Sequence, residues 1–348
     1  MINKSKRIAY VDVLRGICIT SISFMHASFW VLPFYNLFFI SAFYFVSGVT
    51  FRDDSPIDFI LRKIKGLYIP FVIVNISALI IDIIWKYLSF GKFHGWAIYG
   101  TQILKIICFN LVDNRMVSGW FVLPLFIISI IFFILHKTIK RDIILAFITF
   151  SFYIITCVCN NMPAYKFFYN HCAILSNIGI GLFIYNLGYL YRKYEDDVKQ
   201  YLNKFGGGGT TFLLCMCIIN VAVVFAQYRE VMREGIWSSA FLKCTITIIS
   251  IYYGVFISDL IASENKIIAK ILSYCGKHSM MIMYFHIFSF SLVTKAVYYF
   301  TGKAWERTWT NTIPEFGFIT GFVGILIPLL IDFCLRNFIT LLKKRLPL

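Results

Sequence analysis

Three ionisable side chains interrupt one otherwise apolar stretch near the N-terminus: Asp12, Arg15 and His26. On a helix, Arg15 and His26 lie about 20° apart around the axis and about 16 Å apart along it, and Asp12 falls within about 40° of the same line. The spacing predicts one helix face with a carboxylate and a guanidinium at one end and an imidazole at the other. The structural alternative is that Asp12 pairs with Arg15 and that His26 hydrogen-bonds a neighbouring helix.

Two basic residues, Arg62 and Lys65, are three positions apart in the segment DFILRKIKGLYIP, which predicts that they share a helix face. Two cations at the mouth of a membrane span can hold the phosphates of a nucleotide-like donor. The alternative is a group of basic side chains that extend toward the cytoplasmic surface without binding a ligand.

Further polar residues lie inside apolar runs. The pair Ser47-Gly48 is small enough to let two helices approach closely, and the serine also offers a hydroxyl. His286 follows Tyr284 by two residues in another run. A histidine in such a position is either a support between helices or a substrate contact, and Tyr284 can donate a hydrogen bond.

The elements that position these residues are expected to be membrane helices. The chain has 348 residues, of which 59% are hydrophobic and 14% are charged, and its mean hydropathy is +0.76. A soluble domain carries about 25% charged residues, so most of this chain must contact lipid. The same numbers exclude the disordered and nucleic-acid-binding classes. The ten Cys have no metal-ligand spacing, so we expect no metal site and no disulfide framework.

Ten apolar runs are long enough to cross about 30 Å of hydrocarbon, which predicts an all-α polytopic membrane protein. About 21 of the 33 Lys and Arg fall on the side that holds both termini, so both termini are expected in the cytoplasm. The segment 96–112 is expected as an interfacial helix on the outer side, and the tetraglycine 206–209 as a flexible loop. The expected spans are 11–32, 34–51, 67–89, 119–136, 142–159, 173–191, 210–228, 237–261, 279–300 and 314–335.

Five segments together resemble the integral-membrane acyltransferase family 3, the ten-span bacterial proteins that O-acylate surface carbohydrates and peptidoglycan. DVLRGICITSISFMH resembles the family's opening D-x-L-R-G with a His ten residues beyond the Arg. FYFVSGVTF, GWFVLPLF and GKHSMMIMYFH resemble its segments in the second, fourth and ninth spans. The family's R-x-x-R motif is present with a lysine in second place, as Arg62 and Lys65, and lysine lacks the bidentate fork of arginine.

The resemblance implies one membrane-embedded acyltransferase domain over residues 1–348, without a soluble accessory domain, in the cytoplasmic (inner) membrane of a bacterium. It implies that acetyl-CoA is the acyl donor, with Arg62, Lys65 and Arg15 on its phosphates, and that no metal is used. His26 would be the general base toward a carbohydrate hydroxyl, with Asp12 orienting Arg15. Ser47, Tyr284 and His286 would position the substrates. The expected partners are the acyl-CoA donor, a carbohydrate acceptor and the lipid bilayer, with no nucleic acid.

Two other classes compete with this interpretation. A transporter or flippase of a lipid-linked sugar would also have ten spans and a basic inner face, but it predicts paired halves with broken helices, which the sequence does not contain. A structural subunit of an envelope complex would leave Asp12, Arg15 and His26 without a purpose. The acceptor, the acyl group, the choice between an acyl-histidine intermediate and direct transfer, and the oligomeric state are left open at this point.

Overall fold

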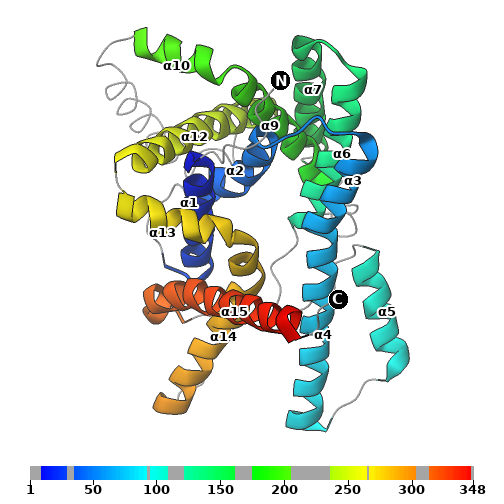
Figure 1. The fold of residues 1–348 in the computed structure, drawn as a ribbon, viewed down its shortest axis with the longest axis vertical. Helices are drawn as coiled ribbons and strands as arrows, with labels where there is room; N and C mark the ends of the chain where they lie inside the picture. The colour runs from blue at the N-terminus through cyan, green and yellow to red at the C-terminus, as the bar shows by residue number, and fades with distance from the viewer. Residues whose placement is uncertain are drawn as a thin grey trace. The chain divides into compact units, whose positions relative to one another are not determined.

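A computed structural model of the chain describes residues 9–29, 35–91, 95–108, 121–160, 175–204, 236–264, 266–302 and 313–345. Within these ranges every regular element is a helix, as expected for a chain whose backbone must satisfy its own hydrogen bonds in lipid (Figure 1). The α-helices are α1 (Ala9–His26), α2 (Tyr35–Val49), α3 (Pro56–Lys63), α4 (Ile69–Phe90), α5 (Trp96–Ile107), α6 (Val122–Thr138), α7 (Asp142–Asn160), α9 (Leu175–Lys193), α10 (Glu195–Lys204), α12 (Ile236–Glu264), α13 (Lys266–Lys277), α14 (Ser279–Thr301) and α15 (Gly317–Arg345).

Nine of the ten expected spans coincide with a helix, and the remaining one, 210–228, lies outside the described residues together with the tetraglycine. Four stretches are long and apolar enough to cross a membrane, and α6 and parts of α2 and α7 form shorter apolar helices. The described residues therefore belong to a membrane protein. The four stretches are Pro56–Ile84, Thr247–Glu264, Ser279–Thr301 and Gly317–Phe338.

The first helix ends earlier than expected, at His26 and not near residue 32. Ser28 has a φ of 61°, and the amides of Ser28 and Phe29 donate to the carbonyls of Met25 and Phe24 at 3.1 Å. These two bonds are those of a Schellman motif, which terminates a helix by satisfying its last carbonyls. His26 is therefore at the end of its helix and not in the middle of a span.

The third expected span begins earlier than its apolar run. α3 passes into α4 through a π-helical segment, Ile64–Tyr68, without a break in the helix. Arg62 and Lys65 therefore lie within a continuous helical stretch and not in a loop before it. A π-helical turn is rare and is found often at functional sites.

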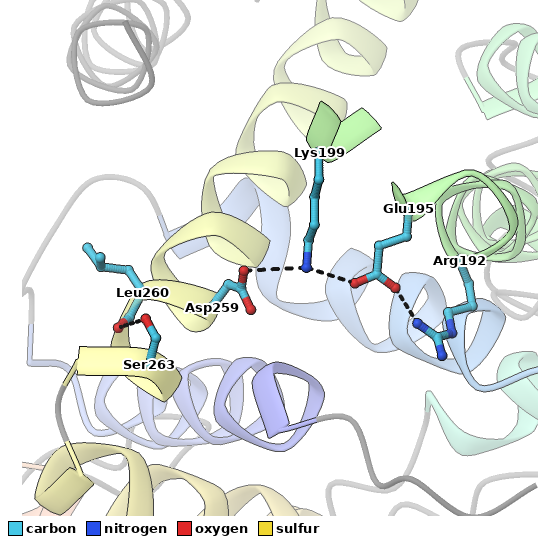
Figure 2. Close-up of polar contacts among 6 residues, drawn as sticks. All are labelled: Arg192, Glu195, Lys199, Asp259, Leu260 and Ser263. Carbon is cyan, nitrogen blue, oxygen red and sulfur yellow. Dashed lines mark hydrogen bonds and ion pairs between the residues drawn. The ribbon is translucent and has the colours of Figure 1, made fainter. Parts of the chain in front are cut away.

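Two helices occupy segments that were expected to be loops, α10 within 192–209 and α13 within 262–278. Four charged residues hold α10 in place (Figure 2). Glu195 pairs with Arg192 of α9, and Lys199 lies 3.0 Å from Glu195 and 3.5 Å from Asp259 of α12. This chain of charges ties the short helix to both of its neighbours.

The chain divides into two compact units, and each is described by itself. The first consists of Met1–Cys18, Leu32–Lys63 and Pro124–Ser273. In it, α2 packs against α9, and glycines let the two backbones meet. A Cβ at Gly48 would collide with the carbonyl oxygen of Tyr185, and one at Gly188 would collide with that of Phe45. The expected role of Gly48 as a close-approach residue is confirmed.

The second unit consists of Ile19–Val31, Ile64–Leu123 and Tyr274–Leu348. Its main contact joins α14 to α15. The end of α1 packs on α15, where the Ser23 hydroxyl donates to the Gly321 carbonyl at 3.0 Å. The Phe24 ring lies edge-on against Phe322 with centroids 5.1 Å apart. These contacts fix the last turn of α1, which carries His26.

Candidate active site

In the first unit, the beginning of α1 carries Asp12 and Arg15. Asp12 is buried, with 4% of its surface exposed, and Arg15 is half-buried. The next residue, Gly16, lies against the carbonyl of Leu272 in α13, so α1 and α13 are in backbone contact at this point. The close contact holds this turn of α1, and the side chain of Arg15 with it.

In the same unit, the cationic groups of Arg62 and Lys63 both lie over the ring of Phe59. Arg62 forms an ion pair with Asp54, and its guanidinium lies 5.3 Å from the centre of the Phe59 ring. The Lys63 ammonium lies 5.5 Å from the same ring and 5.8 Å from the Tyr185 ring. Cations over aromatic faces at these distances are attracted by the negative face of the ring. The two neighbouring cations are therefore positioned by contact with buried aromatic rings.

Lys63 also lies within electrostatic reach of both guanidiniums, those of Arg62 and Arg15. The structure therefore brings together Arg15, Arg62 and Lys63, and this basic cluster is suited to a polyanion. The sequence motifs do not single out Lys63. The one sequence feature that points to it is Phe59, an aromatic residue four positions earlier and therefore on the same helix face. Lys65 is exposed in the π-helical segment. The wider turn of a π-helix breaks the three-residue spacing on which a common face with Arg62 depends.

The second unit pairs the two intramembrane histidines that the sequence singles out. The rings of His26 and His286 are stacked, with centroids 5.3 Å apart and planes inclined by 27°. His286 is fully buried, whereas His26 is half-buried. Two residues that are 260 positions apart in the sequence thus form one imidazole pair.

The protonation of His286 is set by its own helix. Its Nδ1 lies 3.0 Å from the Ile282 carbonyl and 2.8 Å from the Met283 carbonyl. Carbonyl oxygens only accept, so Nδ1 carries the hydrogen and Nε2 of the neutral ring is an acceptor. Among the described residues, neither this Nε2 nor the buried hydroxyl of Tyr284 has a hydrogen-bond partner. The two atoms lie on different faces of α14, because residues two positions apart on a helix do not face each other.

Ser47 has a local partner, since its hydroxyl donates to the Phe43 carbonyl of α2 at 2.8 Å. In the part of the chain that the structure describes, no three His, Cys, Asp or Glu side chains are grouped as metal ligands would be. The polar groups that the structure assembles are thus a basic cluster in one unit and an imidazole pair in the other.

A profile of known families identifies the chain. The acyltransferase family 3, described as an acyltransferase domain, matches residues 8–333. The match covers nearly the whole chain, so the protein belongs to this family, as the motifs around Arg15, Arg62 and His286 predict. It is a membrane acyltransferase. No curated protein and no solved structure matches the chain.

Proposed function

We propose that this membrane acyltransferase is an O-acetyltransferase that moves an acetyl group from cytoplasmic acetyl-CoA to a hydroxyl of a cell-surface or lipid-linked carbohydrate. The stacked pair of His26 and His286 carries the proposal. In this pair, His286 has an acceptor nitrogen fixed by its own helix, and that nitrogen has no hydrogen-bond partner among the described residues. The hydroxyl of an acceptor can donate a hydrogen bond to this nitrogen.

The basic cluster of Arg15, Arg62 and Lys63 binds the donor phosphates in this proposal. Arginine and lysine make strong charge-assisted hydrogen bonds to phosphate oxygens, and coenzyme A carries a diphosphate and a phosphate monoester. Lys65 adds a further cation near the start of α4, and Asp12 orients Arg15. Arg15 and His26 are both on α1, about 16 Å apart along an ideal helix. In this proposal the long pantetheine arm extends along α1 in the direction of His26.

The transfer step uses His26 as the general base. Its imidazole takes the proton of the acceptor hydroxyl while that oxygen attacks the thioester carbonyl. The carbon–sulfur bond then breaks, and the thiolate of coenzyme A leaves with the proton from the imidazolium. An acetyl-histidine intermediate divides the same chemistry into two steps. In both versions His286 and Tyr284 position the acceptor, and Ser47 supports the packing of α2.

The proposed location is the cytoplasmic membrane of a bacterium, with both termini inside. This orientation follows from the excess of Lys and Arg on one set of loops. It gives the basic cluster access to acetyl-CoA, which is made in the cytoplasm. The acceptor is reached in or across the membrane.

The experiment measures two quantities: acetyl-CoA binding to the purified protein, and acetyl transfer from labelled acetyl-CoA in isolated membranes. His26→Ala is expected to reduce transfer by about 100-fold or more, with donor affinity unchanged. Arg62→Ala is expected to weaken donor binding. Lys270→Ala, at an exposed position of α13, is the matched control and leaves both unchanged. Full acetyl transfer by His26→Ala would contradict the role of His26 as the general base. Unchanged acetyl-CoA binding by Arg62→Ala would contradict the role of Arg62 in binding the donor phosphates.

A further inference from the structure

A polar cavity lies in the first unit, where α6 ends, α7 begins and α9 ends. Its volume is about 250 Å³, and the segment between α2 and α3 completes its wall. Ammonium groups and carboxylates dominate the lining: Lys137, Lys140, Lys193, Asp53 and Asp142, with the ring of Tyr189. None of these residues belongs to the site described above.

Two ion pairs hold lysines at the cavity wall. Lys137 lies 2.5 Å from Asp53, and Lys193 lies 2.6 Å from Asp142. The hydrogen bond to Asp142 raises the pKa of Lys193 above its ordinary value, so this ammonium is charged at neutral pH. Lys140 is a third cation on the wall, which leaves the lysines in excess over the two carboxylates. Half-exposed ion pairs of this kind contribute little to stability, so the ammonium groups can turn to an incoming anion.

The aromatic side of the cavity consists of rings in contact with one another. His136, also on its wall, lies 5.1 Å from the Tyr189 ring and 5.0 Å from the Phe51 ring, centroid to centroid. The Phe132 ring stacks on the His136 ring with centroids 6.1 Å apart, and Phe132 is fully buried. The lysines of the cavity wall therefore lie next to a group of packed aromatic rings.

The cavity adjoins the basic cluster through two consecutive residues. Asp53 contacts Lys137 of the cavity, and Asp54 pairs with Arg62 of the basic cluster. Neighbouring Cα atoms are about 3.8 Å apart, so cations on the two sides are held by adjacent carboxylates. The two sets of cations are thus tied to one short stretch of chain, which suits a ligand with two separate phosphate groups.

We propose that this cavity binds a phosphate monoester, the ribose 3′-phosphate of coenzyme A, while Arg62 and Lys63 hold the diphosphate of the same molecule. The inference rests on the acetyl-CoA donor of the proposed function. A phosphate monoester carries close to two negative charges at neutral pH, and lysine is a common phosphate-binding residue. Each carboxylate of the wall already contacts an ammonium group, which makes the cavity a poor site for a metal cation.

The test compares coenzyme A with 3′-dephospho-coenzyme A, which lacks only this phosphate. Affinities are measured by calorimetry on the full chain in nanodiscs of phosphatidylcholine. The wild type is expected to bind coenzyme A about tenfold more tightly, the equivalent of about one charged hydrogen bond. Lys140→Gln and the double variant Lys137→Gln/Lys140→Gln are expected to lower that preference toward one and to leave dephospho-coenzyme A affinity unchanged. Lys270→Gln is the matched control and keeps the preference.

Lys140 is exposed and outside the helices, so its substitution does not endanger folding. Equal affinity of the wild type for the two ligands overturns the inference and leaves the proposed function standing. So does an equal loss for both ligands in the lysine variants. Absence of binding of either ligand overturns the acetyl-CoA donor and this inference together. An anionic lipid headgroup offers similar chemistry, and tighter binding to phosphatidic acid without a preference between the two ligands would assign the cavity to lipid.

Discussion

At the scale of single residues, Tyr284 and His286 carry the unusual chemistry. A buried hydroxyl and a buried imidazole nitrogen without partners each cost about 1–3 kcal/mol of folding free energy. They lie two residues apart on α14, and the ring of His286 stacks on that of His26. A buried polar group without a partner needs an explanation, and for these two atoms we propose a ligand.

Removing the hydroxyl of Tyr284 shows whether this group affects the stability of the protein, substrate binding, or both. In Tyr284→Phe we expect no loss of thermal stability, because the hydroxyl has no partner among the described residues. We expect acetyl transfer in isolated membranes to fall by about tenfold, the value of one hydrogen bond to substrate. Melting temperature and transfer rate are measured on the same membranes.

The chain offers a matched control for this variant. The hydroxyl of Tyr44, in the first unit, is also buried and has no partner among the described residues. Tyr44→Phe is expected to keep both stability and activity. If Tyr284→Phe behaves in the same way as Tyr44→Phe, the tyrosine has no part in positioning the acceptor.

The residue types at the site were available from the sequence, but their partners were not. Asp12, Arg15 and His26 stand out because charged and polar groups are expensive in an apolar run. The contact of His26 with His286 and the position of Lys63 between Phe59 and Tyr185 depend on helix packing. No local spacing contains that information.

At the scale of elements, the contact of α2 with α9 depends on glycine. Gly48 and Gly188 each lie against a backbone carbonyl of the other helix. Without a hydrophobic driving force between helices in lipid, such close backbone packing is a main source of stability.

A methyl group at this contact is expected to be costly. Gly188→Ala should destabilise the protein by about 1–3 kcal/mol, the usual cost of overpacking a close contact. Gly100→Ala on α5 is the control, since an added Cβ there meets nothing within 4 Å. Melting temperatures in detergent are compared, and equal values for both variants would show that α2 and α9 tolerate separation.

Element boundaries illustrate the limit of hydropathy. The apolar run of the first span continues past His26, yet the Schellman motif at Ser28 ends the helix there. Conversely, α3 and the π-helical segment extend the third helix upstream of its apolar run. Backbone hydrogen bonding decided both helix boundaries. Hydropathy averaged over a window of residues contains no information about these hydrogen bonds.

At the scale of the whole molecule, the charge distribution predicts the orientation in the membrane. The loop that holds Lys140 belongs to the basic set, and α5 belongs to the opposite set. The proposed donor sites require the first set to face the cytoplasm, where acetyl-CoA is made.

Cysteine labelling measures this orientation. In a variant whose native cysteines are replaced, Lys140→Cys is expected to react with an impermeant maleimide only in inverted vesicles. Ala97→Cys, at an exposed position of α5, is expected to react from the outside of intact cells. Reaction of Lys140→Cys from outside would reverse the orientation and remove the cytoplasmic access of the cavity.

The sequence by itself determined the solvent and the family of this protein. Composition requires lipid around the helices, and motifs at fixed spacing, such as Arg15 and His26, identify an acyltransferase. The tertiary structure alone decided which residues meet: His26 with His286, Lys63 with two aromatic rings, and Lys137 and Lys193 around one cavity. The physical reason is range: burial and helix periodicity act on neighbouring residues, whereas a site is made by side-chain packing between segments far apart in the chain.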